Sequence, residues 1–141
     1  MDPSDAFYRN ALNRKTIDGF YDVIGHGSPD SIMYTVCKNS RTLAPEELAR
    51  VIRTRPDYAD EAIRLLSCET GCSPIGFAQR LANEMSKDVL APSDVLWATS
   101  RGDMFIAPQV RDQFGRIVVD QWGRTSPNMM KLGEWRLFRP L

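Results

Sequence analysis

Short apolar runs alternate with amphipathic stretches between residues 20 and 92, and their order predicts the fold. Residues 20–25, 62–67 and 88–92 are β-prone runs bounded by Gly, Pro or charged residues. Residues 45–55 and 73–85 lie between them and place apolar side chains at helical spacing. Strands separated by helices pair in parallel through right-handed crossovers. The pattern therefore predicts an α/β fold with a short, mainly parallel sheet and flanking helices.

Both predicted helices carry start signals. Pro45 followed by two glutamates suits a first helical turn. Proline has no N–H, but an N–H at this position would have no partner within the helix. Acidic side chains are stabilised by the positive end of the helix. Ser73 and Pro74 predict the second start, as a capping residue and a first helical residue. Residues 31–36 are a further, weaker strand candidate.

The pattern changes after residue 92, where short apolar runs are separated by Gly and charged turns. We expect one domain over residues 1–141, with a core at 20–92 and a β-rich C-terminal extension at 93–141. No internal repeat is evident, and residues 1–19 are expected to form a loose or helical lead-in. The short strands expected in the extension are 95–98, 104–106 and 117–119, and the apolar residues 135–138 close the chain.

Composition removes several classes of protein. The 141 residues are 43% hydrophobic and 26% charged, as in ordinary globular chains, and Lys+Arg and Asp+Glu both number 18. A net charge of zero makes nucleic-acid binding by bulk electrostatics an unexpected function. No apolar run approaches the roughly 20 residues of a membrane-spanning helix, and the first residues lack the apolar segment of a secretory signal.

One histidine and one cysteine form the main candidate site. His26 is the only histidine of the chain, and it follows the first predicted strand; Cys68 follows the second. The carboxyl ends of neighbouring parallel strands meet at one edge of a sheet, where ligand sites form. An imidazole beside a thiol can take its proton and activate it as a nucleophile. We therefore predict His26 and Cys68 as a catalytic dyad.

The backbone around this pair suits acyl transfer. Gly27 allows a substrate carbonyl to approach closely, and the N–H groups of Gly27 and Cys68 are predicted to form an oxyanion hole. The positive end of the helix expected from Ser73 would also favour a thiolate. Four carboxylates are candidates to orient His26, although a solvated surface charge is the commoner role: Asp22, Asp30, Glu69 and Asp94.

Plainer interpretations remain open for the same residues. A cysteine after an apolar strand is usually a small core residue, and a histidine between glycines is often a turn residue. Cys37 suits a structural role, and Cys72 suits packing or the role of a resolving thiol. His26 and the three cysteines could also supply four zinc ligands, but their scattered spacing argues against this, and we expect no metal and no cofactor.

The residues around the dyad resemble the caspase–hemoglobinase fold, clan CD, of cysteine peptidases. The resemblance lies in an apolar strand ending in His-Gly, at residues 23–27, and an apolar strand ending in Cys-x-x-Gly, at residues 63–71. It implies His26 as general acid and base, Cys68 as nucleophile and the Gly27 N–H in the oxyanion hole. This chain departs from the clan in its shorter length and in Leu66, where many members carry an acidic or amide residue, so no substrate-pocket residue is implied.

Longer strings are similar to C-terminal modules of bacterial polymorphic toxins, such as those that end rearrangement-hotspot repeat proteins. This resemblance implies a delivered effector, carried by a larger protein or exported by a secretion system and acting in the cytoplasm of a target cell. The strings that carry it are residues 64–71, 76–83, 89–94 and 133–140.

Together these patterns predict a cysteine-dependent hydrolase, most simply a peptidase, acting as a bacterial effector or toxin domain. Its expected partners are a protein substrate and an immunity or chaperone protein, with no nucleic acid and no membrane span. A deamidase or acyl transferase would use the same dyad, and a non-catalytic module that binds a host or immunity protein would not need it.

Overall fold

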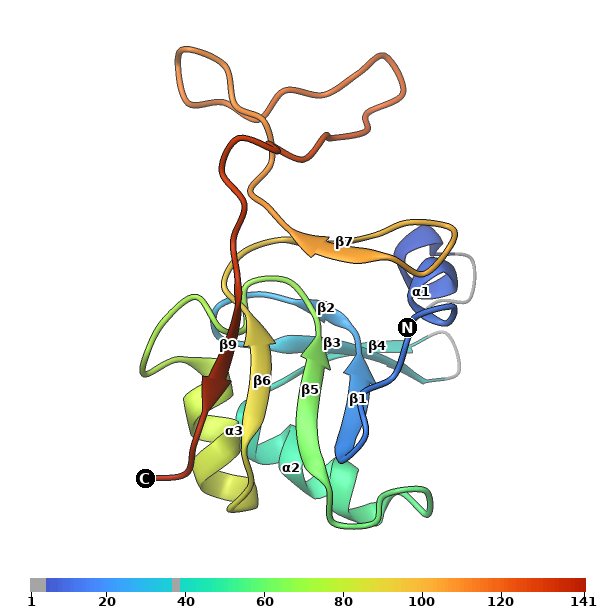
Figure 1. Cartoon of the computed structure of the whole chain (residues 1–141), viewed down its shortest axis with the longest axis vertical. Helices are drawn as coiled ribbons and strands as arrows, with labels where there is room; N and C mark the ends of the chain where they lie inside the picture. Colours follow the sequence, from blue (N-terminus) through green and yellow to red (C-terminus); the bar gives the residue numbers. More distant parts are fainter. Residues whose placement is uncertain (1–4, 37–38) are drawn as a thin grey trace.

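A four-stranded sheet forms the centre of the computed structural model, which describes residues 5–36 and 39–141. Its strand order is β1 (Phe20–Ile24), β5 (Ala62–Leu66), β6 (Val89–Pro92) and β9 (Trp135–Phe138). The first three strands are parallel, whereas β9 runs antiparallel to β6 (Figure 1). The predicted α/β class with a mainly parallel sheet is confirmed.

Two helices cover one face of this sheet and bury the main core. They are α2 (Pro45–Thr54) and α3 (Phe77–Met85), and each presents an apolar stripe to the strands. Alternate strand residues meet these stripes, because side chains of a strand point to opposite faces in turn. The fully buried members of the core include Ile52, Ile63, Leu65, Phe77, Leu81 and Val89.

Of the two predicted helix starts, one is confirmed and one is wrong. α2 begins at Pro45 as predicted, and the Glu47 carboxylate accepts a hydrogen bond from the Ala44 N–H at 3.1 Å. α3 begins at Phe77 and not at Ser73 or Pro74. The Ser73 hydroxyl instead accepts the Ile75 N–H at 3.3 Å, so it closes a turn ahead of the helix.

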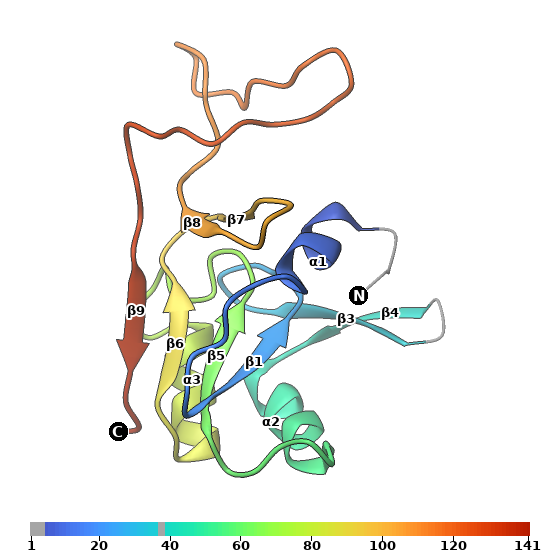
Figure 2. The ribbon, with the colours of Figure 1, turned by 45° about the vertical axis from the view of Figure 1, so that its right-hand side comes forward.

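The opposite face of the sheet is covered by the start of the chain. Helix α1 (Ala6–Ala11) leads into residues 12–19, which run across the strands (Figure 2). Beneath them Asp22 of β1 and Arg64 of β5, partners in register, form a two-pronged ion pair with both distances at 2.7 Å. Arg14 adds a third bond to Asp22 at 2.7 Å, and the Lys15 carbonyl accepts from Arg64.

This ion cluster is buried. Arg64 is 4% exposed and the Asp22 side chain 3% exposed, and Trp135 lies 5.9 Å from the Arg64 guanidinium. Burial by itself raises the pKa of Asp22, but hydrogen bonds from Arg64 and Arg14 outweigh it and hold the pKa below its ordinary value. Asp22 is therefore neither a solvated charge nor a partner of His26, the two roles that the sequence suggested.

Two small sheets lie beyond the carboxyl ends of the parallel strands. One joins β2 (His26–Gly27), β3 (Ile32–Val36) and β4 (Asn39–Leu43) in an antiparallel meander, of which only β3 was expected. The other pairs β7 (Leu96–Ala98) with β8 (Met104–Ile106), as expected. Cys37 lies outside the described residues.

Residues 108–133 form an arm that projects from the end of the molecule between β8 and β9 (Figures 1 and 2). The strand expected at 117–119 is wrong: the arm holds only two isolated bridges, Gln109 to Pro127 and Arg111 to Ile117. The arm is closed at its base, where the Gly133 N–H donates to the Ile106 carbonyl at 2.8 Å.

The arm contains a repeated turn, so the expectation of no internal repeat is also wrong. Asp-Gln-Phe-Gly-Arg at 112–116 is followed by Asp-Gln-Trp-Gly-Arg at 120–124. In both, the aspartate carboxylate accepts two backbone N–H groups and the glycine has a positive φ, 78° and 76°. In both, the arginine lies over the aromatic ring, at 5.1 and 5.2 Å.

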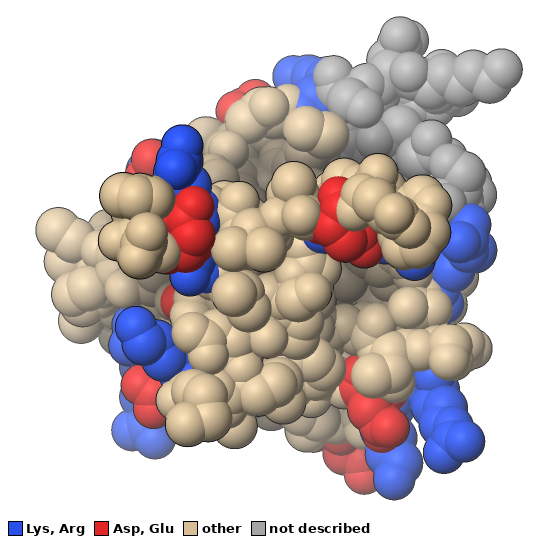
Figure 3. Space-filling view, turned by 90° about the horizontal axis from the view of Figure 1, so that it is seen from above, with Lys and Arg blue, Asp and Glu red and all other residues tan. Residues whose placement is uncertain are grey.

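Apolar side chains are unusually exposed along this arm. Phe114 and Trp122 are 69% and 68% exposed, and Met130 is 92% exposed. Viewed from the end that carries the arm, the surface is largely uncharged, with charges confined to small separate groups (Figure 3). Trp122 therefore lies outside the core. Among the described residues, no helix is long and apolar enough to span a membrane.

We expect the arm to be dispensable for folding. Its two ends meet at Ile106 and Gly133, so a Gly-Ser-Gly link in place of residues 109–132 should shift the melting temperature by less than about 4 °C. Removing residues 135–141 should instead unfold the domain, because Phe138 of β9 belongs to the core. Thermal melting followed by circular dichroism checks both, and cooperative unfolding lost in the arm deletion would contradict the prediction.

The buried ion cluster should dominate the acid stability. We expect Asp22→Asn to lower the unfolding free energy by about 3–5 kcal/mol, since two arginines lose their buried counter-charge. Asp60→Asn, at an exposed pair with Lys87, is the matched control and should cost about 0–1 kcal/mol. Because the pKa of Asp22 is lowered on folding, its contribution is complete above about pH 4 and is lost as the pH falls further.

Urea unfolding at pH 7 and at pH 3 measures both effects. The wild-type protein should lose more stability than Asp22→Asn between these two values. Equal losses in the two proteins would show that another carboxylate controls the acid transition.

Candidate functional site

The chain segments that follow β1 and β5 touch each other at the carboxyl edge of the sheet. The Gly25 N–H donates to the Leu66 carbonyl at 3.2 Å, extending the parallel pairing by one step. A Cβ atom on Gly27 would lie 2.5 Å from the Cys68 carbonyl oxygen and 2.9 Å from the Ser67 Cβ. Only glycine fits there, because any side chain would push the two segments apart. His26 and Cys68 therefore belong to adjoining backbone segments.

The turn that carries Cys68 is fixed on both sides. Glu69, with a φ of 62°, donates its N–H to the Asp94 carbonyl at 3.0 Å, and the Gly71 N–H donates to the Pro92 carbonyl at 2.9 Å. Thr70 is buried, and its hydroxyl lies 3.2 Å from that of Ser67. A left-handed residue other than glycine is a strained feature that the surrounding structure must hold, and such features gather at functional sites.

His26 is oriented by Asp5, a residue that sequence reasoning missed. The Asp5 carboxylate caps α1 through the Tyr8 N–H, and its other oxygen lies 2.5 Å from His26 Nε2. Burial raises the pKa of Asp5, but the bonds from Tyr8 and His26 outweigh it and lower the pKa. An ionised carboxylate can only accept, so Nε2–H is the donor of this bond and Nδ1 is the ring nitrogen that Asp5 does not engage.

Cys68 is held as a neutral thiol. Its Sγ is partly buried and lies 3.9 Å from the Leu96 carbonyl oxygen. Burial raises the pKa of the Cys68 thiol, and the Glu69 and Asp94 carboxylates raise it further. The positive helix end expected to lower it begins at Phe77, where the first N–H groups donate to the carbonyls of Pro29 and Thr70.

Phe7 of α1 lies close to His26 and also to the apolar residues around Cys68. Its ring centroid lies 6.2 Å from that of His26. Phe7 and Cys68 also pack against the same small apolar cluster of Leu66, Leu96 and Ile106. The start of the chain thus covers this edge of the sheet.

The candidate residues are brought together in part. His26, Gly27 and Cys68 share one sheet edge, as the parallel pairing of β1 and β5 requires. The hydrogen bonds of the described residues join His26 to Asp5 and Cys68 to Leu96, and not to each other. Asp5 escaped detection because nothing in the sequence marks a carboxylate 21 residues before the histidine as its neighbour.

A metal centre has no support among the described residues, where no three histidine, cysteine or acidic residues are grouped to hold an ion. Cys72 is a partly buried free thiol, and its pKa is raised by burial and by Glu69. The suggested zinc set also includes Cys37, which lies outside the described residues.

The fold is that of an α/β domain with a mainly parallel sheet, and its N-terminal helix lies over the edge that carries the candidate site. A protein-family model described as Domain of unknown function (DUF8616) matches residues 1–106. The chain belongs to this family. Comparison with curated proteins and with solved structures yields no match. The matched residues end at the last residue of β8, so the arm and β9 follow the matched region.

The protonation state of Cys68 predicts its reactivity. With the pKa raised by burial, alkylation of Cys68 by iodoacetamide should accelerate about tenfold per pH unit from pH 7 to pH 9, following the thiolate fraction. Phe7→Ala should speed the reaction severalfold by uncovering the thiol, while Cys72 serves as the internal control.

Peptide mapping by mass spectrometry follows each cysteine separately. A rate for Cys68 that is flat between pH 6 and pH 8 would contradict the prediction, because it would reveal a thiolate already paired with an imidazolium.

Proposed function

We propose that this protein is a cysteine-dependent peptidase that acts as a bacterial effector or toxin domain. The observation that carries the proposal is the contact of Gly27 with the Cys68 backbone, which sets the only histidine and a cysteine on adjoining segments at the carboxyl edge of a parallel sheet. The resemblance of residues 23–27 and 63–71 to clan CD peptidases supports the same assignment.

The chemistry needs one proton carrier and one nucleophile. His26 Nδ1 takes the Cys68 thiol proton as sulfur attacks the scissile carbonyl carbon. The N–H groups of Gly27 and Cys68 stabilise the oxyanion. His26 then gives the proton to the leaving amine, which departs and leaves a thioester. Water, deprotonated by His26, hydrolyses the thioester, releases the carboxylic acid and restores the thiol.

Asp5 acts as a positioning residue in this scheme. Its bond to Nε2 fixes the ring and the tautomer, and its negative charge stabilises the imidazolium formed during each proton transfer. Because the pKa of Cys68 is raised, the scheme has a neutral thiol that is activated when the substrate binds. It does not need a permanent thiolate–imidazolium pair.

Delivery and partners follow from the second resemblance. The similarity of these strings to C-terminal modules of polymorphic toxins supports export within a larger protein or through a secretion system. It also supports action in the cytoplasm of a target cell and control by an immunity or chaperone protein. Protein substrates are the expected targets.

Inducible expression in a bacterial cytoplasm tests the function. Wild type should arrest growth, while Cys68→Ala and His26→Ala should each remove the arrest and lower peptide cleavage by about a thousandfold or more. The double variant should cleave peptides no more slowly than either single variant, because the two residues act as one unit. Cys72→Ala is the matched control and should remain toxic.

Three further measurements make the expression experiment decisive. Melting temperatures must show that each variant is folded. Mass spectrometry of new protein N-termini must show cleavage that depends on Cys68. Asp5→Asn should lower kcat with little change in KM, and Asp5→Glu should restore part of it. A toxic Cys68→Ala variant would end the nucleophile assignment.

A deamidase would give a different product from the same dyad. It would raise substrate masses by about 1 Da at glutamine without creating new N-termini, since the thioester would release ammonia instead of a peptide amine. The same mass spectra therefore separate the two enzymes.

The arm favours a second, non-catalytic candidate function. Its exposed Phe114, Trp122 and Met130 provide the large apolar and aromatic side chains that dominate protein interfaces. A module that only binds a partner would keep its effect in Cys68→Ala and lose it when the arm is deleted.

A further inference from the structure

Strand β1 lies at one edge of the main sheet and has one side without a strand partner among the described residues. The Gly25 N–H donates to the Leu66 carbonyl, and the Gly19 carbonyl accepts the Ala62 N–H. Because backbone groups alternate in direction along a strand, those of residues 19, 21, 23 and 25 face β5. The N–H and C=O groups of Asp22 and Ile24 therefore face outward.

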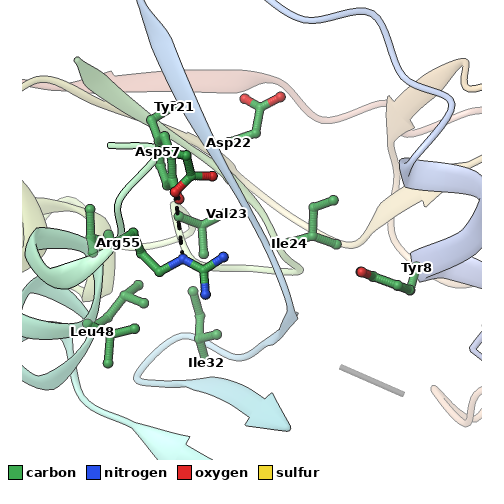
Figure 4. A pocket seen from close by; sticks show the side chains of 11 residues that line it. Tyr8, Tyr21, Asp22, Val23, Ile24, Ile32, Leu48, Arg55 and Asp57 are labelled. Atoms are coloured by element: carbon green, nitrogen blue, oxygen red, sulfur yellow. Dashed lines mark hydrogen bonds and ion pairs between the residues drawn. The ribbon is translucent and has the colours of Figure 1, made fainter. Parts of the chain in front are cut away.

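A cavity of about 370 Å³ follows this free edge. Four consecutive residues of β1, from Tyr21 to Ile24, line it. Consecutive side chains point to opposite faces of a sheet, so a space that contacts all four lies along the edge itself. Helix α2 contributes Leu48 and Val51 to its lining, and β3 contributes Ile32. In Figure 4, Leu48 and Ile32 lie across the cavity from β1.

The rim of the cavity is polar but electrically balanced. The Tyr21 hydroxyl donates to Asp57 at 2.8 Å, and Arg55 lies 3.7 Å from the same carboxylate. In Figure 4 the Tyr21 and Asp57 side chains lie together, and the Arg55 side chain extends from them so that its guanidinium lies between Val23 and Ile32. The charges of Arg55 and Asp57 offset each other, and the side chains of Val23, Leu48 and Ile32 provide the apolar part of the lining beside them.

We propose that this edge binds an extended polypeptide as an added β-strand, with a large apolar side chain seated in the cavity. Unpaired N–H and C=O groups at alternate residues are complementary to another extended backbone. A ligand residue opposite Val23 would point to the same face as Val23, toward α2, because cross-strand partners share a face. That residue is the specificity position, and Leu, Met or Phe suits it.

The edge is continuous with the candidate active site. β1 ends at Ile24, and His26 follows after Gly25. A strand bound along β1 would extend its backbone toward His26 and the Cys68 turn. The choice of a protein substrate as the occupant rests on the proposed peptidase function, whereas the strand-binding edge rests on the backbone and cavity alone.

Nuclear magnetic resonance of the ¹⁵N-labelled Cys68→Ala protein tests binding without cleavage. The probes are five acetylated, amidated pentapeptides, Thr-Thr-Xaa-Thr-Thr, with Leu, Phe, Ser, Asp or Lys at the centre. We expect the Leu and Phe peptides to shift the amide signals of Asp22, Ile24 and Val51, with about tenfold or more higher affinity than the Ser, Asp and Lys peptides.

Two changes should weaken this binding. Val51→Trp fills the cavity, and N-methylation of the two residues flanking the central Leu removes the ligand's N–H donors without altering the protein. Each should weaken binding about tenfold or more. Val119→Trp, at an exposed position of the arm, is the matched control and should bind as the parent does. The N-methylated peptide keeps the test valid should Val51→Trp misfold.

Several outcomes would overturn the inference. Signals that shift only in the arm, equal affinity for all five peptides, or unchanged binding of the N-methylated peptide would each do so. A dimer in sedimentation that Val51→Trp dissociates would assign the edge to a second copy of this chain. Peptide binding without any Cys68-dependent cleavage would refute the peptidase but leave the strand-binding edge intact.

Discussion

The paired charges of Asp22 and Arg64 are the constraint on which the rest of the structure depends. They lie directly opposite each other on β1 and β5, and both are buried beneath the start of the chain. A shift of one residue in register would turn Asp22 away from its guanidinium partner and reverse which face of β1 is apolar. The same register aligns Gly25 with Leu66 and presses Gly27 onto Cys68. Register and candidate site are thus fixed by one buried pair.

The N-terminal segment joins these features into one unit. Arg14 and the Lys15 carbonyl complete the ion cluster, while Asp5 holds His26 and Phe7 covers the apolar cluster beside Cys68. One short stretch of chain therefore both closes the second face of the sheet and orients the only histidine. In the proposed enzyme, Asp5 connects helix α1, which it caps, with the orientation of the His26 ring.

The arm follows a different physical logic. Two turns of nearly identical sequence each satisfy their own backbone groups through an aspartate carboxylate and place an arginine on an aromatic ring. Such turns are stable locally and need no core, which is why their apolar residues remain exposed. The arm begins after the region that the family model matches. It leads the chain back to β9, which pairs with β6 and completes the sheet.

The sequence by itself determined the local elements and their order. Apolar periodicity located β1, β5, β6 and α2, and the strand–helix alternation predicted parallel pairing, which placed His26 and Cys68 at one edge. It misplaced the start of α3, because Ser73 and Pro74 suit a turn as well as a helix start. It also overlooked the turn at 112–116 and its copy at 120–124. Only the tertiary structure decided that Asp5 partners His26, that Asp22 is buried against two arginines and that β1 keeps a free edge beside a cavity. Each of these depends on contacts between distant segments, and local propensity carries no information about which distant carboxylate, guanidinium or helix will be the neighbour.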